Sequence, residues 1–307
     1  MNRLKNNPFF GSVSIVLIIS LSLLSSCIWK ENSVAHPLPY IAPPLLNINP
    51  VEKQQLSNRV ASYFKESLLR YEGIFSGGIL VAKGGHVLFE HYAGFTDYPK
   101  KIQPLQEDSP LHIASTSKTF TAIAILQLVQ QQKISLDDTL ELFFEKWPYP
   151  GVTIKQLLTH RSGLPNYTYF MEADKQGKLA YTNKDIIDWM IQHKPAPHAR
   201  PDSRFEYCNT NYLLLATLIE KTSGYSYPEF LRRSIFTFLS MKNTFVFEPA
   251  DAVKATPSFV NSSQPWPLDH LDLTYGDKNI YSTPRDLLKW DQALYTKQLV
   301  SDSLLDL

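Results

Sequence analysis

The chain has 307 residues, of which 44% are hydrophobic and 19% are charged, and its 30 basic residues nearly balance its 29 acidic ones. These values exclude a disordered chain and allow one large domain or two closely packed ones. The net charge of +1 gives no sign of a nucleic-acid or other polyanionic partner. We therefore expect a globular protein that binds no nucleic acid.

The N-terminus has the pattern of an export signal. Arg3 and Lys5 precede an apolar run over residues 9–24, which is too short and wrongly flanked for a membrane span. We assign residues 1–26 as a signal peptide. The sequence Leu-Ser-Ser-Cys that ends at Cys27 resembles a bacterial lipobox, whose cysteine is lipidated and becomes the first mature residue. The alternative is an ordinary signal peptide with a chance cysteine.

A proline-rich segment follows. Residues 27–50 include five prolines and show no helical or strand periodicity, which is typical of a semi-extended tether. We expect this tether to hold the domain off the membrane to which Cys27 anchors it, in the bacterial cell envelope and facing the periplasm or the cell surface. With Cys27 lipidated, Cys208 has no intramolecular partner, so we expect no disulfide.

The domain, residues 51–307, is expected to open with a helix and a hairpin. One apolar stripe predicts an amphipathic surface helix over residues 51–69. Two apolar runs, 79–82 and 87–89, are joined through Lys-Gly-Gly-His, and the glycine pair supplies the positive φ angles of a tight hairpin turn. These are the clearest strands in the sequence.

Capping patterns predict the helices that follow. A threonine or serine with an amide or carboxyl side chain three residues later satisfies free N–H groups in the first turn of a helix. Such pairs predict helix starts at Thr153, Thr182, Ser226 and Thr283, and an apolar run predicts a helix over residues 212–222.

A serine and a lysine stand three residues apart where a long apolar run begins. Residues at i and i+3 share a helix face, so Lys118 can lie beside the Ser115 hydroxyl. A serine hydroxyl is a poor nucleophile until a base takes its proton. The helix N-terminus adds free N–H groups and a positive end, which favour developing negative charge.

The same spacing occurs at Ser62 and Lys65, so spacing alone does not choose between the two serines. Residues 120–129 are apolar almost all round, which predicts a helix buried in the domain centre. Because a buried helix holds its end rigidly, we prefer Ser115 over Ser62 as the reactive residue.

A second candidate pair is Tyr207 and Asn209. In an extended loop, side chains at i and i+2 point the same way, so both can face one cleft. A phenol beside a lysine can act as a base, and the amide can bind substrate or orient the lysine. The alternative is an aromatic residue packed before a helix. The same spacing at Tyr181 and Asn183 is better explained as a helix start.

Together, these pairs resemble the penicillin-recognising serine hydrolases, which include class C β-lactamases, D-alanyl-D-alanine carboxypeptidases, D-aminopeptidases and related esterases. Flanking stretches from about residue 55 to the end support the resemblance, at residues 78–81, 156–165, 205–212, 235–244 and 280–287. The resemblance implies an α/β (α+β) fold of the β-lactamase/transpeptidase type. An antiparallel sheet would be flanked by helices and joined to a mostly helical region.

The resemblance also implies roles for the residues of the two pairs. Ser115 would be the nucleophile of an acyl transfer, and its backbone N–H would form half of the oxyanion hole. Lys118 would assist in removing the proton, Tyr207 would act as general base or acid, and Asn209 would position substrate. The choice of general base between Lys118 and Tyr207 stays open. So does the substrate, which is a β-lactam, a D-amino peptide or an ester.

Other expectations follow from what the sequence lacks. It has no His-Glu-x-x-His motif, glycine-rich phosphate loop or Gly-x-Ser-x-Gly elbow, so we expect no metal and no cofactor. We expect a monomer that meets a small-molecule or peptide substrate and contacts a membrane only through its lipid anchor.

The resemblance is incomplete at one point. The family carries a Lys-Thr-Gly triplet, or a histidine equivalent, on a strand after the last helical segment, and this sequence has none. Residues 221–224 come near it, but they are better interpreted as a helix C-cap. The resemblance thus implies that the C-terminal sheet strands and half of the oxyanion hole are missing. The alternative function is a non-catalytic lipoprotein that binds peptidoglycan peptides or a partner.

Overall fold

The structure is a computed structural model that describes residues 39–67, 75–97, 100–173, 180–261 and 264–306. The predicted signal peptide and the lipobox cysteine Cys27 lie outside the described residues. Within these ranges, no helix is long and apolar enough to cross a membrane.

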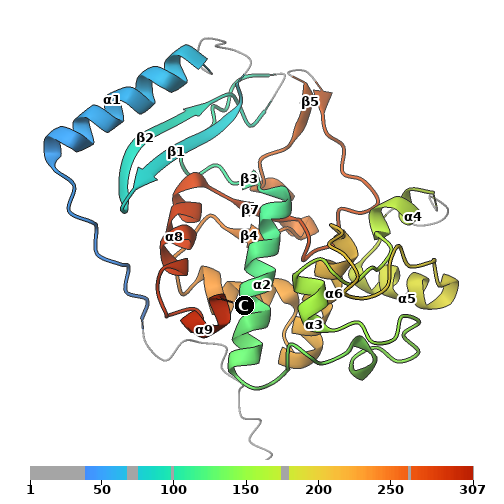
Figure 1. Ribbon diagram of the computed structural model, residues 1–307. Helices are drawn as coiled ribbons and strands as arrows, with labels where there is room; N and C mark the ends of the chain where they lie inside the picture. Colours follow the sequence, from blue (N-terminus) through green and yellow to red (C-terminus); the bar gives the residue numbers. More distant parts are fainter. Residues whose placement is uncertain (1–38, 68–74, 98–99, 174–179, 262–263, 307) are drawn as a thin grey trace, which may run out of the picture. The chain divides into compact units, whose positions relative to one another are not determined.

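The first helix and the hairpin pack on each other, as Figure 1 shows. Helix α1 (Pro50–Ser67) lies along strand β2 (His86–Ala93), where the Phe64 ring stacks on Phe89 with centroids 5.2 Å apart. Strand β1 (Gly77–Lys83) pairs antiparallel with β2. The turn glycines have φ angles of 56° and 83°, which fits the prediction of a glycine-dependent turn. Among the residues that the structure describes, β2 is the only strand paired with β1.

The described part of the proline-rich segment follows the surface of the same domain. Residues 39–49 form no helix or strand. The Leu46 N–H donates to the Gly84 carbonyl at 3.0 Å, and the Ile41 backbone exchanges two hydrogen bonds with the Gln298 side chain. Backbone contacts of this kind hold the segment in one place.

A small three-stranded sheet lies close to the N-terminal end of helix α2 (Ser117–Gln130). Strand β7 (Ile280–Ser282) pairs antiparallel with β3 (Leu111–His112) on one side and with β4 (Phe245–Val246) on the other. A separate antiparallel pair joins β5 (Phe259–Asn261) and β6 (Gln264–Pro265). The sequence analysis predicted none of these strands, because two- and three-residue strands are too short to show a period of two.

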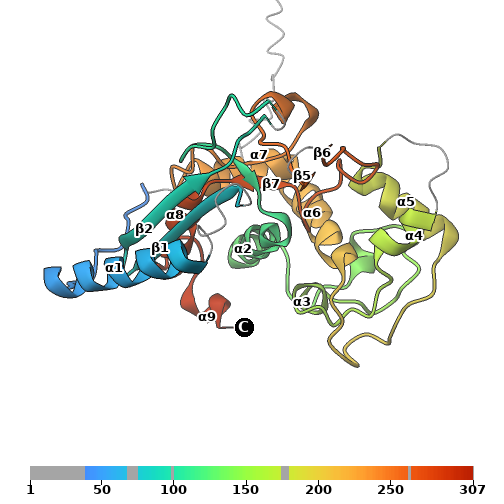
Figure 2. The same cartoon turned by 90° about the horizontal axis from the view of Figure 1, so that it is seen from above.

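Helices α2 (Ser117–Gln130) and α6 (Asn209–Ser223) pack against each other in the core, and Figure 2 shows them between the hairpin and the helices labelled α4 and α5. Helix α2 is buried nearly all round, as its sequence predicts. The remaining helices are α3 (Ile154–Leu158), α4 (Tyr167–Ala173), α5 (Asn183–His193), α7 (Tyr227–Leu231), α8 (Pro284–Leu294) and α9 (Asp302–Leu305).

The predicted caps lie at the predicted helix starts. Thr153 and Thr182 form full capping boxes, and Ser226 and Thr283 accept hydrogen bonds from the backbone three residues on. Helix α6 differs, because it begins at Asn209 and not at residue 212. The first turn of the helix is polar. The apolar pattern, from which we predicted the helix, therefore starts one turn after the helix itself.

Three side chains of α2 hold the segment before β7. Thr121 Oγ1 donates to the Gly276 carbonyl at 2.7 Å, and Lys118 Nζ donates to the next carbonyl at 2.7 Å. Ser117 Oγ accepts from the Ile280 N–H at 3.1 Å. Gly276 has a φ of +100°, and a Cβ there would lie 2.3 Å from the Tyr212 carbonyl oxygen. Only glycine fits at this crossing of α2, α6 and the segment.

We expect Gly276→Ala to destabilise the fold by more than about 2 kcal/mol, because it adds a backbone clash to a left-handed φ. The matched control is Gly224→Ala at the end of α6, where φ is +77° and a Cβ meets nothing within 4 Å. That change should cost only about 1 kcal/mol. Urea unfolding of both variants measures the difference, and equal losses would contradict the close contact.

Candidate active site

Ser115 lies at the exposed end of a buried helix. It is the middle residue of a 3₁₀ turn, Ala114–Thr116, that leads directly into α2. Ala114 adopts a positive φ of 45°, which is uncommon for a residue with a Cβ. Ser115 is exposed, whereas Ser117 and Lys118 are buried. The turn therefore presents the Ser115 hydroxyl to solvent at the end of a buried helix.

Lys118 is buried, with 6% of its surface exposed, and its ammonium has three hydrogen-bond partners. Nζ lies 3.2 Å from Ser115 Oγ, 2.9 Å from Asn209 Oδ1 and 2.7 Å from the Asp277 carbonyl oxygen. An ammonium has three N–H groups, so these partners use all of them. Two of the three, the amide and the carbonyl oxygen, can only accept, which leaves Ser115 as the one partner able to give up a proton.

Tyr207 also contacts the serine hydroxyl. Its hydroxyl donates to Ser115 Oγ at 2.9 Å, and the Lys118 ammonium lies 4.9 Å from the centre of its ring. The structure thus brings together all four residues that the sequence analysis selected, Ser115, Lys118, Tyr207 and Asn209. The expected geometry was only partly right, since Asn209 is the first residue of α6 and Cys208 is its N-cap.

The repeated spacings lie elsewhere. Ser62 and Lys65 are both exposed on α1, a helix without a buried residue. Asn183 is buried at the start of α5, where its amide bonds the backbone of Tyr275 and Leu213. These arrangements fit the structural explanations that the sequence analysis preferred for them.

His160 holds the Tyr207 segment in position. Its carbonyl accepts from the Glu206 N–H at 2.8 Å, and its Nδ1 accepts from the Cys208 N–H at 3.1 Å. The ring also packs 4.6 Å from the Tyr207 ring. Because Nδ1 is an acceptor here, the imidazole is neutral, with its proton on Nε2. Burial, helped by the nearby positive charge of Lys118, lowers the pKa of His160 to about 4.

One backbone donor at the site has no acceptor. Among the described residues, the Ser115 N–H makes no hydrogen bond, although the next N–H, that of Thr116, donates to the Ile113 carbonyl at 3.1 Å. A free N–H on the nucleophile itself is the kind of donor that stabilises an oxyanion. This geometry supports the predicted role of the Ser115 N–H in an oxyanion hole.

Asp277 is a site residue that the sequence analysis missed. It contacts Lys118 through its backbone carbonyl, and the two residues are 159 positions apart. Every residue has a backbone carbonyl, so no sequence motif identifies a residue that acts through one. Asp277 is 1% exposed, and its carboxyl Oδ2 lies 2.9 Å from the Tyr167 hydroxyl.

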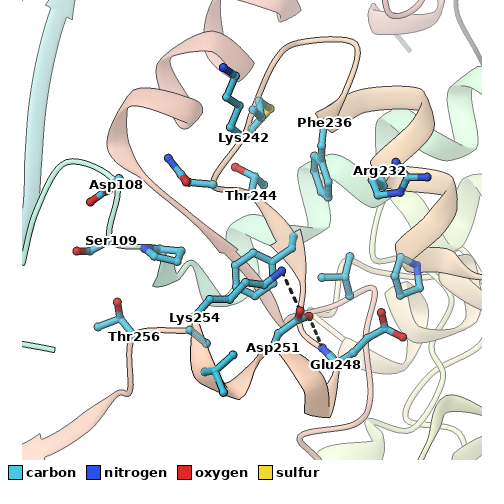
Figure 3. Close-up of a pocket in the computed structure, with 18 of the residues that line it drawn as sticks. Asp108, Ser109, Arg232, Phe236, Lys242, Thr244, Glu248, Asp251, Lys254 and Thr256 are labelled. Carbon is cyan, nitrogen blue, oxygen red and sulfur yellow. Dashed lines mark hydrogen bonds and ion pairs between the residues drawn. The ribbon is translucent and has the colours of Figure 1, made fainter. Parts of the chain in front are cut away.

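The structure also contains a large cavity of about 1150 Å³, and none of the four candidate residues lines it. Figure 3 shows its wall, where Lys254 pairs with Asp251 and Asp251 accepts from the Glu248 N–H. At another point of the wall Arg232 pairs with Glu229. Its charges largely neutralise one another, so the cavity offers no evident chemistry. Among the described residues, no cluster of histidine, cysteine and acidic side chains is suited to a metal ion.

The lowered pKa of His160 makes part of the folding stability depend on pH. An unfolded histidine titrates near 6.5, so the stability that neutral His160 contributes is complete at pH 7 and is lost as the pH falls toward 4. The loss amounts to at most ~3 kcal/mol. We expect His160→Asn, which suits the positive φ of 54° at this position, to remove this component. Urea unfolding of both proteins at pH 7 and pH 4.5 tests this, and parallel losses would contradict it.

Comparison with known proteins agrees with this geometry. The sequence profile of the family described as Beta-lactamase matches residues 64–306. Penicillin-binding protein 4* of Bacillus subtilis (strain 168) is 33% identical over 243 residues, which are 74% of this chain and 54% of that protein. D-aminopeptidase of Brucella anthropi is 28% identical over 230 residues, 70% of this chain and 42% of that protein.

A solved structure shows the same fold. The penicillin-binding protein from Bacillus halodurans aligns with a TM-score of 0.68 at 28% identity, over 81% of this chain and 76% of that chain. The expected β-lactamase/transpeptidase-like fold, with helices and antiparallel sheets, is confirmed. The chain spans about half the length of the curated relatives it matches. It belongs to the β-lactamase family, whose members here include penicillin-binding proteins and a D-aminopeptidase.

Proposed function

We propose that this protein is a serine hydrolase that cleaves an amide or an ester through an acyl-enzyme on Ser115. One observation carries the proposal. The Ser115 hydroxyl oxygen lies within hydrogen-bond distance of two groups that can exchange a proton with it, Lys118 Nζ at 3.2 Å and the Tyr207 hydroxyl at 2.9 Å. A nucleophile touching its own activating groups is the signature of covalent catalysis.

The proposed reaction follows from the positions of these groups. Ser115 Oγ attacks the substrate carbonyl carbon while its proton passes to a deprotonated partner, either the neutral Lys118 amine or the Tyr207 phenolate. The carbonyl oxygen becomes an oxyanion that the Ser115 N–H binds. The proton then goes to the leaving amine or alcohol as the bond to carbon breaks, and water releases the acyl group by the same steps in reverse. Asn209, which holds Lys118 at 2.9 Å, orients the lysine and the substrate.

The first test is covalent labelling of Ser115. A fluorescent fluorophosphonate should label the protein, and Ser115→Ala should abolish the label, because the reacting oxygen is gone. Ser62→Ala is the matched control, since it changes the serine of the same motif on α1 and should label normally. Lys118→Ala and Tyr207→Phe should each slow labelling by about 10²-fold or more. Absence of label on a folded wild-type protein would favour the non-catalytic binding protein instead.

The same pair of proteins, wild type and Ser115→Ala, can be used to identify the substrate class. The relative with D-aminopeptidase activity in its name favours D-amino amides. Turnover of a D-amino-acid anilide, a chromogenic cephalosporin and a simple ester by wild type and Ser115→Ala would separate the three classes. A rate that survives in Ser115→Ala does not come from this site.

We also propose that the protein acts in the cell envelope as a lipoprotein anchored through Cys27. The lipobox-like sequence ending at Cys27 and the proline-rich tether after it support this. In a bacterial host the wild-type protein should incorporate radiolabelled palmitate, and Cys27→Ala should not. Palmitate labelling that persists in Cys27→Ala would rule out a lipid anchor at Cys27.

A further inference from the structure

Asp277 lies directly behind Lys118 and contacts it through its backbone carbonyl, not through its side chain. The Asp277 carbonyl accepts from Lys118 Nζ at 2.7 Å, whereas carboxyl Oδ2 contacts the Tyr167 hydroxyl on α4 at 2.9 Å. The side chains of both residues are buried, with 1% and 0% of their surfaces exposed. The protonation state of this carboxyl therefore decides which charges lie behind the lysine.

A row of four oxygen atoms indicates the protonation state of the Asp277 carboxyl. Asp277 Oδ2 is 2.9 Å from the Tyr167 hydroxyl, which is 2.9 Å from Thr274 Oγ1, which is 2.7 Å from the Leu271 carbonyl oxygen. Three contacts of this length each need a hydrogen between the oxygens. The tyrosine and the threonine supply one hydrogen each, and the Leu271 carbonyl supplies none. The third hydrogen has to come from Asp277.

With Asp277 protonated, the row is complete. The acid donates to Tyr167, Tyr167 donates to Thr274, and Thr274 donates to the Leu271 carbonyl, so each hydroxyl gives and accepts one bond. With Asp277 ionised, one of the three contacts lacks a hydrogen and brings two lone pairs together.

The surroundings of the other carboxyl oxygen also favour a protonated Asp277. Among the described residues, Asp277 Oδ1 has no hydrogen-bond partner. An ionised carboxylate that is buried with only the Tyr167 hydroxyl and its own N–H as donors is costly, whereas a neutral acid leaves only a carbonyl-like oxygen unpaired. The groups that face it are Lys118 on α2, Tyr167 on α4, Tyr227 on α7 and the adjacent Lys278. Burial raises the pKa of Asp277 despite the positive charges of the two lysines.

We propose that Asp277 is a positioning residue that works as a neutral carboxylic acid, fixing its own carbonyl against Lys118 without adding a negative charge behind it. The three acceptors of Lys118 are themselves uncharged, and a neutral Asp277 carboxyl adds no negative charge near them. The lysine charge stays directed at Ser115, where negative charge develops during acylation. The catalytic part of this inference rests on the proposed function; the protonation state does not.

A second buried aspartate provides the contrast. Asp286, 2% exposed, accepts from the Asn243 N–H at 2.8 Å, from Thr244 Oγ1 at 3.0 Å and from Lys289 Nζ at 2.7 Å. It therefore has three donors, including an ammonium, whereas the Asp277 carboxyl has only the Tyr167 hydroxyl and its own N–H. The same residue type is thus built for two different states in one chain.

Infrared spectroscopy of the 307-residue chain tests the protonation state directly. At pH 7, a protein with isotope-labelled aspartate should show a protonated-carboxyl C=O band that disappears in Asp277→Asn and persists in Asp286→Asn. The band should also persist in Ser115→Ala, which removes the proposed chemistry but not the row of oxygens. A spectrum without such a band, or a band unaffected by Asp277→Asn, would overturn the proposal.

Thermal unfolding gives a second readout. An unfolded aspartate ionises near pH 4 while native Asp277 stays protonated, so this residue makes the wild type less stable as the pH rises. Asparagine does not titrate. From pH 4 to pH 8 the melting temperature of Asp277→Asn should therefore rise relative to that of wild type, by roughly 10 °C if native Asp277 stays protonated throughout. A constant or reversed difference would contradict a neutral Asp277.

Labelling kinetics test the positioning role. Asp277→Ala, which leaves the row without its acid and the loop less fixed, should slow fluorophosphonate labelling of Ser115 by about tenfold or more. Asp277→Asn, whose amide can donate to Tyr167, should restore most of that rate. Equal rates in the two variants would remove the positioning role. If wild type itself is not labelled, the proposed function fails, while the infrared result still decides the state of Asp277.

Discussion

The site depends on one buried ammonium. Lys118 lies where α2, the start of α6 and the segment before β7 meet. Its ammonium donates to Ser115 beside α2, to Asn209 at the start of α6 and to the Asp277 carbonyl before β7. Burying a lysine charge is expensive unless its donors are satisfied. The fold meets this requirement with a serine hydroxyl, an amide and a backbone carbonyl. Because all three are neutral, the lysine is held in place without an ion pair that would commit its charge elsewhere.

This requirement explains features that look unrelated along the chain. Gly276 lets the segment cross the Tyr212 carbonyl closely enough to bring the next carbonyl to Lys118. Thr121 and Ser117 fasten the same segment to α2 at two further points. On the other side, His160 binds the backbone around Tyr207 in its neutral form. Burial also raises the pKa of Tyr212 to about 12, so that phenol stays uncharged beside the lysine.

The sequence predicted those parts of the fold that depend on residue type and on the local periodicity of apolar residues. The hairpin, the buried helix behind Ser115 and the capped helices are local patterns, and they lie where expected. The short strands β3, β4 and β7 were missed, since two or three residues carry no period. The start of α6 was placed one turn late, because its first residues are polar even though Thr210 and Asn211 are buried.

The candidate site divides in the same way. Ser115, Lys118, Tyr207 and Asn209 were found because their functional groups are side chains at fixed spacings. Asp277 acts through a backbone carbonyl, and His160 through a carbonyl and a ring nitrogen that accepts from the backbone, so neither shows in a motif. What distinguishes Ser115 from Ser62 is also absent from the motif, since both have a lysine three residues on. The difference is that Lys118 is buried among neutral acceptors while Lys65 is exposed on α1. A serine becomes a candidate nucleophile in this fold through the surroundings of its lysine, and those surroundings come from segments far away in the chain.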